Sequence, residues 1–187
     1  MDGWSYRLKD VELYIGISRS SYILRKFQSG LIGSSYTFHL SPEVEGRWVK
    51  ITRTIDVDYE HLQLCEVQVF AEVGPDYFEG VRNLALGKKA YQPDSYYKYS
   101  YAHKAVDGDT YEVMDMGSCI LTKQTVNAWW DVDLGKTYLI RNARIFNRVD
   151  ADSMYINIVF SLFFGVNPNY GHFTAASGDL AFLDPCL

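Results

Sequence analysis

Several features that define common protein classes are scarce or missing in this 187-residue sequence. It carries 18 Lys and Arg against 23 Asp and Glu, a net charge of -5, so it lacks the basic excess with which proteins bind nucleic-acid phosphates. The longest apolar stretch, residues 155–166, is interrupted by polar residues and falls short of the ~20 residues that a membrane-spanning helix needs. Neither nucleic-acid binding nor a membrane span is therefore expected.

Catalytic motifs are also missing. The sequence contains no G-x-S-x-G, no H-E-x-x-H and no phosphate-binding glycine loop, and its four histidines are scattered. Met1 is followed by Asp-Gly-Trp-Ser rather than by a basic and then an apolar run, so no secretory signal is expected in this stretch. We therefore expect a protein that is not an enzyme.

Cysteine is rare, with three residues, Cys65, Cys119 and Cys186. In a secreted protein an odd number suggests one disulfide and one leftover thiol, whereas in a cytosolic protein all three would be thiols. The cysteine count alone leaves both possibilities open.

What the sequence does contain is 48% hydrophobic and 16% aromatic residues, enough for a packed core. Apolar residues alternate with polar ones in short runs separated by Gly, Pro, Asn, Asp and Ser, and no helix-like apolar stripe is found. The clearest runs are at residues 11–15, 65–72, 130–134 and 142–145. This pattern predicts an all-β fold, an antiparallel β-sandwich.

Composition divides the chain into sections. Residues 75–82 are rich in Gly and Pro and read as a linker between two patterned sections, 1–74 and 83–150. After Asp150 the character changes, so residues 151–187 are interpreted as an unrelated, irregular C-terminal tail.

The second section carries five motifs in order: NLALGKKAYQ at 83–92, AVDGDT at 105–110, GSC at 117–119, WWDVDLG at 129–135 and FNRVD at 146–150. Together they resemble the first half of a fucolectin domain. This is the calcium-dependent, fucose-binding module of eel fucolectin and tachylectin type, related to the discoidin domains of coagulation factors (type C).

The first section resembles the second half of the same module. Its motifs are YRLKDVELYIG at 6–16, GRWVKI at 46–51 and LCEVQVF at 64–70. The halves stand in swapped order, as in a tandem array cut from the middle of one repeat to the middle of the next. They either pack as one circularly permuted discoidin-like jelly roll, which β-sandwiches with neighbouring termini tolerate, or remain an inactive fragment of a tandem-repeat fucolectin.

The resemblance implies a disulfide and a metal site. The disulfide joins Cys65 to Cys119, one from each section, and leaves Cys186 unpaired. The metal is Ca²⁺, which prefers oxygen ligands. Its ligands in this sequence are Lys104, Asp107, Asp109, Ser118, Cys65 and Glu66, with Lys104 and Cys65 contributing backbone carbonyls.

The resemblance also implies a sugar site in which one His and two Arg hold fucose. Arg148 and Arg7 match the two Arg, and Asp150 and Asp2 are the two candidates for the acidic position that orients them. Leu121 occupies the position of the His, and a Leu side chain cannot donate a hydrogen bond. Three outcomes therefore remain for the site: fucose binding, weak binding or binding of another glycan, or a degenerate surface that binds no sugar.

The function implied is that of a secreted, calcium-dependent lectin of innate immunity, with fucosylated or related glycans as partners and with homo-oligomers possible. The alternative is a non-catalytic, discoidin-like adhesion domain that binds a protein or lipid surface.

Overall fold

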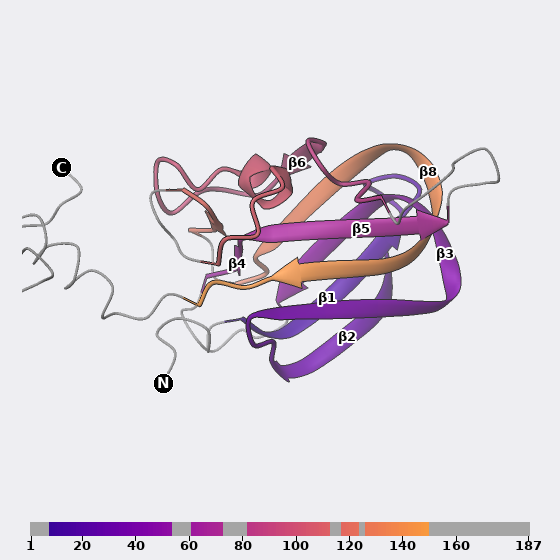
Figure 1. The fold of residues 1–187 in the computed structure, drawn as a ribbon, viewed down its shortest axis with the longest axis horizontal. Coiled ribbons are helices and arrows are strands. Elements are labelled where there is room, and N and C mark those ends of the chain that lie inside the picture. The colour runs from indigo at the N-terminus through magenta and orange to yellow at the C-terminus, as the bar shows by residue number, and fades with distance from the viewer. Residues whose placement is uncertain (1–7, 54–60, 73–81, 113–116, 124–125, 150–187) are drawn as a thin grey trace, which may run out of the picture. The chain divides into compact units, whose positions relative to one another are not determined.

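The computed structural model describes residues 8–53, 61–72, 82–112, 117–123 and 126–149. Within these ranges the chain forms antiparallel strands and one short 3-10 helix, η2 (Ala102–Val106), and no α-helix (Figure 1). The strands are β1 (Lys9–Gly16), β2 (Ile23–Leu31), β3 (Ser35–Arg53), β4 (Gln63–Leu64), β5 (Glu66–Glu72), β6 (Lys89–Tyr91), β7 (Ile120–Leu121) and β8 (Trp129–Phe146). The prediction of an all-β, discoidin-like sandwich is confirmed.

The period-two pattern places the core. In β1 the side chains of Val11, Leu13 and Ile15 are fully buried, while Glu12 and Tyr14 between them stay partly exposed. Strand geometry sends successive side chains to opposite faces, so one face of β1 joins the core. The same alternation in β5 and β8 builds the opposite wall.

Two strands, β3 and β8, are long enough to serve both layers of the sandwich. They pair antiparallel from Ser35↔Phe146 to Thr52↔Trp129, with register shifts after His39 and after Gly46. The second half of β8 lies between the first half of β3 and β5, whereas the second half of β3 pairs with β1 and the first half of β8 pairs with β6. Figure 1 shows both ribbons curving from one layer into the other.

Gly46 stands at one of these shifts for a steric reason. A Cβ atom placed on Gly46 would lie 2.1 Å from the Cγ2 atom of Ile15, which is too close for any side chain. Glycine therefore lets β3 pass close to β1 where the strand changes direction.

Trp130 is the largest fully buried side chain among the described residues. Its indole Nε1–H donates a hydrogen bond to the carbonyl oxygen of Ala102 in η2, at 2.9 Å. The buried polar atom of the ring is thus satisfied, and the hydrogen bond ties η2 to the sheet.

The two sections of the sequence pack into one sheet system. Strands β1 to β5 come from the section 1–74 and strands β6 to β8 from the section 83–150, and the pairs β3–β8, β5–β8 and β4–β7 join them. Most of the expected linker and the whole expected tail, residues 151–187, lie outside the described residues.

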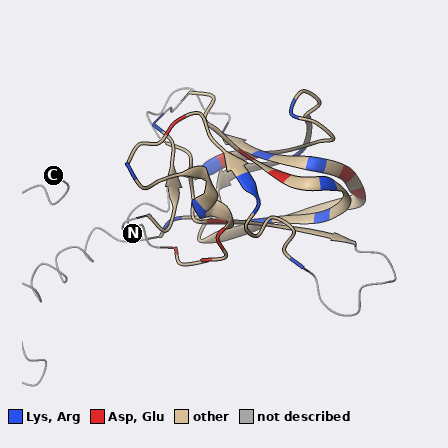
Figure 2. Cartoon of the chain, turned by 90° about the horizontal axis from the view of Figure 1, so that it is seen from above, with Lys and Arg blue, Asp and Glu red and all other residues tan. Residues whose placement is uncertain are grey.

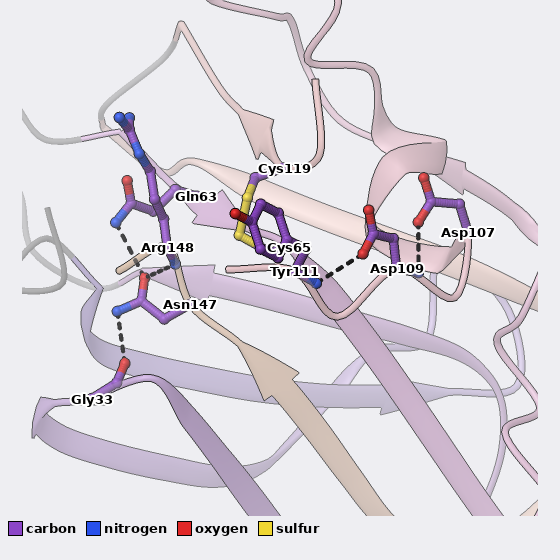
Figure 3. Close-up of a disulfide and its surroundings, with 9 residues drawn as sticks. All are labelled: Gly33, Gln63, Cys65, Asp107, Asp109, Tyr111, Cys119, Asn147 and Arg148. Carbon is purple, nitrogen blue, oxygen red and sulfur yellow. Dashed lines mark hydrogen bonds between the residues drawn. A yellow bond between two sulfur atoms is a disulfide. The ribbon is translucent and has the colours of Figure 1, made fainter. Parts of the chain in front are cut away.

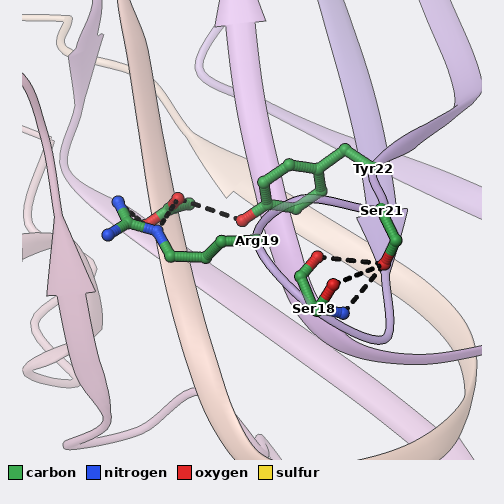
Figure 4. Close-up of polar contacts among 5 residues, drawn as sticks. Ser18, Arg19, Ser21 and Tyr22 are labelled. Atoms are coloured by element: carbon green, nitrogen blue, oxygen red, sulfur yellow. Dashed lines mark hydrogen bonds and ion pairs between the residues drawn. The ribbon is translucent and has the colours of Figure 1, made fainter.

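The outer face of the sheet carries a polar and aromatic cluster. The guanidinium of Arg19 donates two hydrogen bonds to the buried carboxylate of Asp131, at 3.0 and 3.2 Å, and the Tyr22 hydroxyl donates a third at 3.0 Å (Figure 4). Burial raises the pKa of Asp131, and the hydrogen bonds from Arg19 and Tyr22 oppose that rise. The Ser18 backbone N–H donates to the Ser21 hydroxyl at 2.9 Å, which closes the turn that carries Arg19.

Charges of both signs share the described surface. Figure 2 shows Lys and Arg next to Asp and Glu along the same strands. Ion pairs such as Arg47–Asp133, at 2.7 Å, match this distribution, and the Arg47 hydrogen bond holds the pKa of Asp133 below its ordinary value.

Candidate functional site

Those predicted site residues that the structure describes lie toward the end of the sandwich where the two sections meet. Cys65, just before β5, and Cys119, just before β7, form a buried disulfide across 54 positions of sequence (Figure 3). Their sulfur atoms pack with Phe146 at the end of β8. The disulfide expected from the resemblance is therefore present, and it links the two sections covalently.

The acidic turn follows η2 directly. The Asp107 carboxylate accepts a hydrogen bond from the Asp109 backbone N–H at 3.0 Å, and the Asp109 carboxylate accepts one from the Tyr111 N–H at 2.9 Å. Gly108 between them has φ of 88°, a left-handed conformation that glycine adopts without strain. The Lys104 ammonium lies 3.5 Å from the Asp107 carboxylate. The sequence Asp-Gly-Asp thus forms a tight turn that exposes two carboxylates.

Glu66 faces this turn from β5 and is fully buried. Its carboxylate accepts hydrogen bonds from the Gly108 N–H at 3.3 Å and from the Asn83 side-chain amide at 3.4 Å. Burial, with smaller contributions from the negative charges of Asp107 and Asp109, raises the pKa of Glu66 to about 8, although the two hydrogen bonds act in the opposite direction. A buried carboxylate beside two others is an electrostatically unfavourable arrangement that a cation would relieve.

The expected metal ligands meet in part. Glu66, Asp107 and Asp109 lie on facing segments, and Ser118 is buried next to the disulfide. Within the described ranges, no three His, Cys, Asp or Glu side chains converge closely enough to hold a metal ion as they stand. The carboxylates of the turn are directed at backbone N–H groups instead.

Arg148 follows β8 and is held by a buried amide network. Asn147 is fully buried, and its side-chain oxygen accepts hydrogen bonds from the Gln63 amide at 3.1 Å and from the Arg148 backbone N–H at 2.8 Å (Figure 3). Its side-chain amide donates to the Gly33 carbonyl at 2.8 Å, and its backbone N–H donates to the Ser34 carbonyl at 2.7 Å. Two other segments of chain, one at Gly33 and Ser34 and one at Gln63, therefore fix the backbone that carries Arg148.

Replacing Asn147 by Ala is expected to lower the free energy of unfolding by about 2 kcal/mol, because the Gln63 amide and the Gly33 carbonyl each lose a buried partner. Urea denaturation measures the change. Asn142→Ala is the matched control: its amide contacts His39 at an exposed position, so a change of only a few tenths of a kcal/mol is expected. Equal losses in the two variants would contradict a structural role for the buried network.

The remaining sugar residues are placed as follows. Arg7 and Asp150 lie outside the described residues, so their roles remain predictions. Leu121, in β7, is buried and pairs with Gln63 of β4. An open hollow of about 450 Å³ lies beside the acidic turn, lined by Asp109, Thr110, Tyr111, Glu112 and Val149.

Sequence reasoning did not single out Asn147, Gln63 and Asn83, which hold the site together. Asn83 supports Glu66 and also accepts the backbone N–H groups of Val69 and Ala85, at 3.1 and 3.0 Å. Asn147 stands inside the FNRVD motif, so the motif contained it without indicating its role. Gln63 had no signal, because its partner lies 84 positions away.

The two-layer fold, with a disulfide and an acidic turn at one end, defines a discoidin-like β-sandwich domain. A family model described as a NedA-like, galactose-binding domain of F5/F8 type C matches residues 104–159. Fucolectin-6 of Anguilla japonica is 38% identical over 72 residues, which cover 36% of this chain and 39% of the relative. The chain thus spans about two fifths of the length of this curated relative. No solved structure matched the chain.

These matches support a fucolectin-like, discoidin-like domain in this chain. The resemblance identified from the sequence motifs is confirmed.

Proposed function

We propose that this domain is a non-catalytic lectin module that binds fucosylated or related glycans. The observation that carries the proposal is the convergence of both sections at one end, where the buried Asn147 network fixes Arg148 and the adjacent Val149 lines the hollow next to Asp109. The galactose-binding description of the matching model and the name of the eel relative support a carbohydrate as the ligand.

Arginine suits this role chemically. A guanidinium presents several N–H donors in a fixed plane and stays charged, so it binds hydroxyl and ring oxygens without a proton equilibrium. In the proposal, Arg148 and Arg7 donate to the sugar, and Asp150 orients them. Arg148 is buried and its backbone is fixed by Asn147, which limits the conformational freedom that is lost on binding.

Leu121 changes the expected chemistry. It is buried in β7 and presents no hydrogen-bond donor, so one contact of the family's His is missing. Losing a donor to a sugar hydroxyl weakens binding because the ligand's polar group is left without a partner. We therefore propose fucose binding that depends on the two arginines and is weaker than in a His-containing site.

Calcium is proposed as the resident metal of the acidic turn. The ligand set contains oxygen only: the carboxylates of Glu66, Asp107 and Asp109, the Ser118 hydroxyl and the backbone carbonyls of Lys104 and Cys65. This chemistry suits Ca²⁺, and the buried Glu66 beside two carboxylates supplies the charge that a divalent cation would neutralise. Bound calcium would supply local charge balance and crosslink η2, β5 and the segment of Ser118, with no part in any reaction.

The module is proposed to be one circularly permuted domain that acts outside the cell. The strand pairs β3–β8 and β5–β8 and the Cys65–Cys119 disulfide support the permuted arrangement. A disulfide also favours an oxidising compartment. Among the described residues, no helix has the length and apolar character to span a membrane.

A glycan array tests the function directly. We expect fucosylated glycans to be retained with calcium and lost with a chelator, and Arg148→Ala to weaken retention at least tenfold. Arg141→Ala is the control. Arg141 lies elsewhere on β8, is exposed and forms an ion pair with Glu43 of β3. A melting curve for each variant separates lost binding from lost folding. Binding to lipid vesicles without any glycan retention would favour the adhesion alternative instead.

A further inference from the structure

A loop between β6 and η2 carries four exposed tyrosines that the proposed sugar site does not use. Tyr96, Tyr97, Tyr99 and Tyr101 expose 48 to 55% of their surfaces. We call residues 92–101 the tyrosine loop. Large aromatic side chains exposed together on one loop are unusual outside binding surfaces, because burial of each ring stabilises a protein.

The tyrosine loop is fixed from within. The Gln92 side-chain amide donates to the Asp94 carbonyl at 2.6 Å, to the Ser95 hydroxyl at 2.9 Å and to the Ser100 carbonyl at 3.0 Å. Ser100 itself is buried, and the Lys123 N–H donates to the Asp94 carboxylate at 2.8 Å. Polar groups thus close the loop on its inner side, so its tyrosines face outward in a preorganised arrangement.

Three rings, those of His61, Tyr96 and Tyr97, contact one another in sequence. The Tyr96 ring contacts the His61 ring edge-to-face, with centroids 4.6 Å apart, and contacts the Tyr97 ring in the same way at 4.7 Å. His61 comes from the first section of the sequence and Tyr96 from the second. The permuted fold therefore assembles an aromatic surface that neither section contains alone.

Hydrogen bonds and strand pairing connect this surface to Arg148. The Tyr96 backbone N–H donates to the Leu121 carbonyl at 2.9 Å, and Leu121 pairs with Gln63 across β4 and β7. Gln63 in turn donates to Asn147, which holds Arg148. The tyrosine loop and Arg148 therefore lie at the same end of the sandwich.

The chemistry of the surface favours a neutral sugar. A pyranose ring has an apolar face of C–H groups surrounded by hydroxyls, and a tyrosine offers an apolar ring with a polar hydroxyl, so the two match in amphipathic character. Single-stranded nucleic acid also stacks on aromatic rings, but its binding needs a basic groove as well. Within the described residues, the cation paired with a ring of the tyrosine loop is Lys98, over Tyr99. A single such pair does not make a basic groove.

We propose that the tyrosine loop and His61 stack against the apolar face of a neutral pyranose adjoining the fucose of a bound glycan. This inference rests on the proposed function, because it places a second sugar unit beside the residue held by Arg148. Because Leu121 cannot donate the hydrogen bond that a His would supply at its position, stacking on the tyrosine loop would provide binding affinity that does not depend on that bond.

Titration calorimetry of the oxidised, full-length chain tests the proposal with free fucose and a neutral fucosylated trisaccharide. We expect Tyr96→Ala to weaken trisaccharide binding about tenfold and to leave fucose binding unchanged. Tyr96→Phe keeps the ring and is expected to restore the affinity. Phe27→Ala on β2 is the control, since it removes an equally exposed ring at a distant edge of the sheet. Saturation-transfer NMR should show the strongest transfer to the C–H protons of the trisaccharide's apolar face.

The outcomes separate the two proposals. If Arg148→Ala abolishes binding of both sugars while Tyr96→Ala changes neither, the stacking surface is wrong and the lectin function stands. If the wild-type chain binds neither sugar, both proposals fail. Binding of a single-stranded oligonucleotide that Tyr96→Ala abolishes, without any trisaccharide binding, would overturn the stacking proposal in favour of nucleic acid.

Discussion

Chemical reduction of the Cys65–Cys119 disulfide is expected to lower the free energy of unfolding by about 4 kcal/mol. The two cysteines lie 54 positions apart, so the crosslink removes a large loop-closure entropy from the unfolded chain. For a domain of this size the loss corresponds to a fall in melting temperature of roughly 10 °C. Both cysteines are fully buried, and reduction leaves their packing atoms in place.

Denaturant titration of the oxidised and the reduced chain measures this difference on the same sequence. A Cys65→Ala, Cys119→Ala double variant should have the same free energy of unfolding as the reduced protein, apart from the packing energy lost with the two sulfur atoms. The crosslink matters in a second way, because it joins the section that carries Glu66 to the section that carries Arg148. Coincident midpoints for the oxidised and reduced chains would show that strand pairing alone holds the two sections together.

Calcium is expected to raise the melting temperature by roughly 5 to 10 °C at a concentration about 100 times its dissociation constant. That concentration corresponds to about 2.7 kcal/mol of stabilisation for a ligand that binds the folded state only. Replacing the buried Glu66 by Gln, or Asp107 by Asn, should remove the calcium response, because each substitution deletes a charged oxygen ligand. A thermal shift on the oxidised protein, with calcium and then with chelator, provides the measurement.

Glu45→Gln is the matched control for charge. Glu45 is exposed on β3, away from the acidic turn, so its loss changes the net charge equally and should leave the calcium response intact. The Glu66→Gln variant has a further diagnostic value. Without calcium its stability at neutral pH should stay close to that of the wild type, because burial, and to a smaller degree the charges of Asp107 and Asp109, raise the pKa of Glu66 to about 8 and leave its side chain largely uncharged there. Full calcium stabilisation of Glu66→Gln would exclude Glu66 as a ligand.

The strands could be predicted because their pattern is local. Val11, Leu13 and Ile15 alternate with polar residues, and burial of one face of β1 follows directly from strand geometry. The disulfide followed from the order of the motifs that surround its two cysteines, since the resemblance supplied a pairing that the cysteine count left open. The acidic turn could be predicted because Asp107, Gly108 and Asp109 are adjacent in sequence, and glycine permits the turn that they form.

The supports of the site could not be predicted in the same way. Asn147 is satisfied by Gln63 and Gly33, which lie 84 and 114 positions away, and no local pattern indicates such partners. The length of β8 was also hidden. Its sequence shows two alternating runs on either side of Gly135, which would be predicted as two strands. Pairing with β3 and β5 joins them into one continuous strand.

The sequence by itself determined the all-β class and the faces that are buried, and its motifs indicated a resemblance to the fucolectin domain, because alternation and short motifs act between neighbouring residues. The tertiary structure decided which distant residues meet. It placed Glu66 against the acidic turn, fixed Arg148 through Asn147, and brought His61 beside Tyr96. The physical reason is that β-pairing between remote segments sets these contacts, and its register depends on the whole packed sheet rather than on any one stretch of chain.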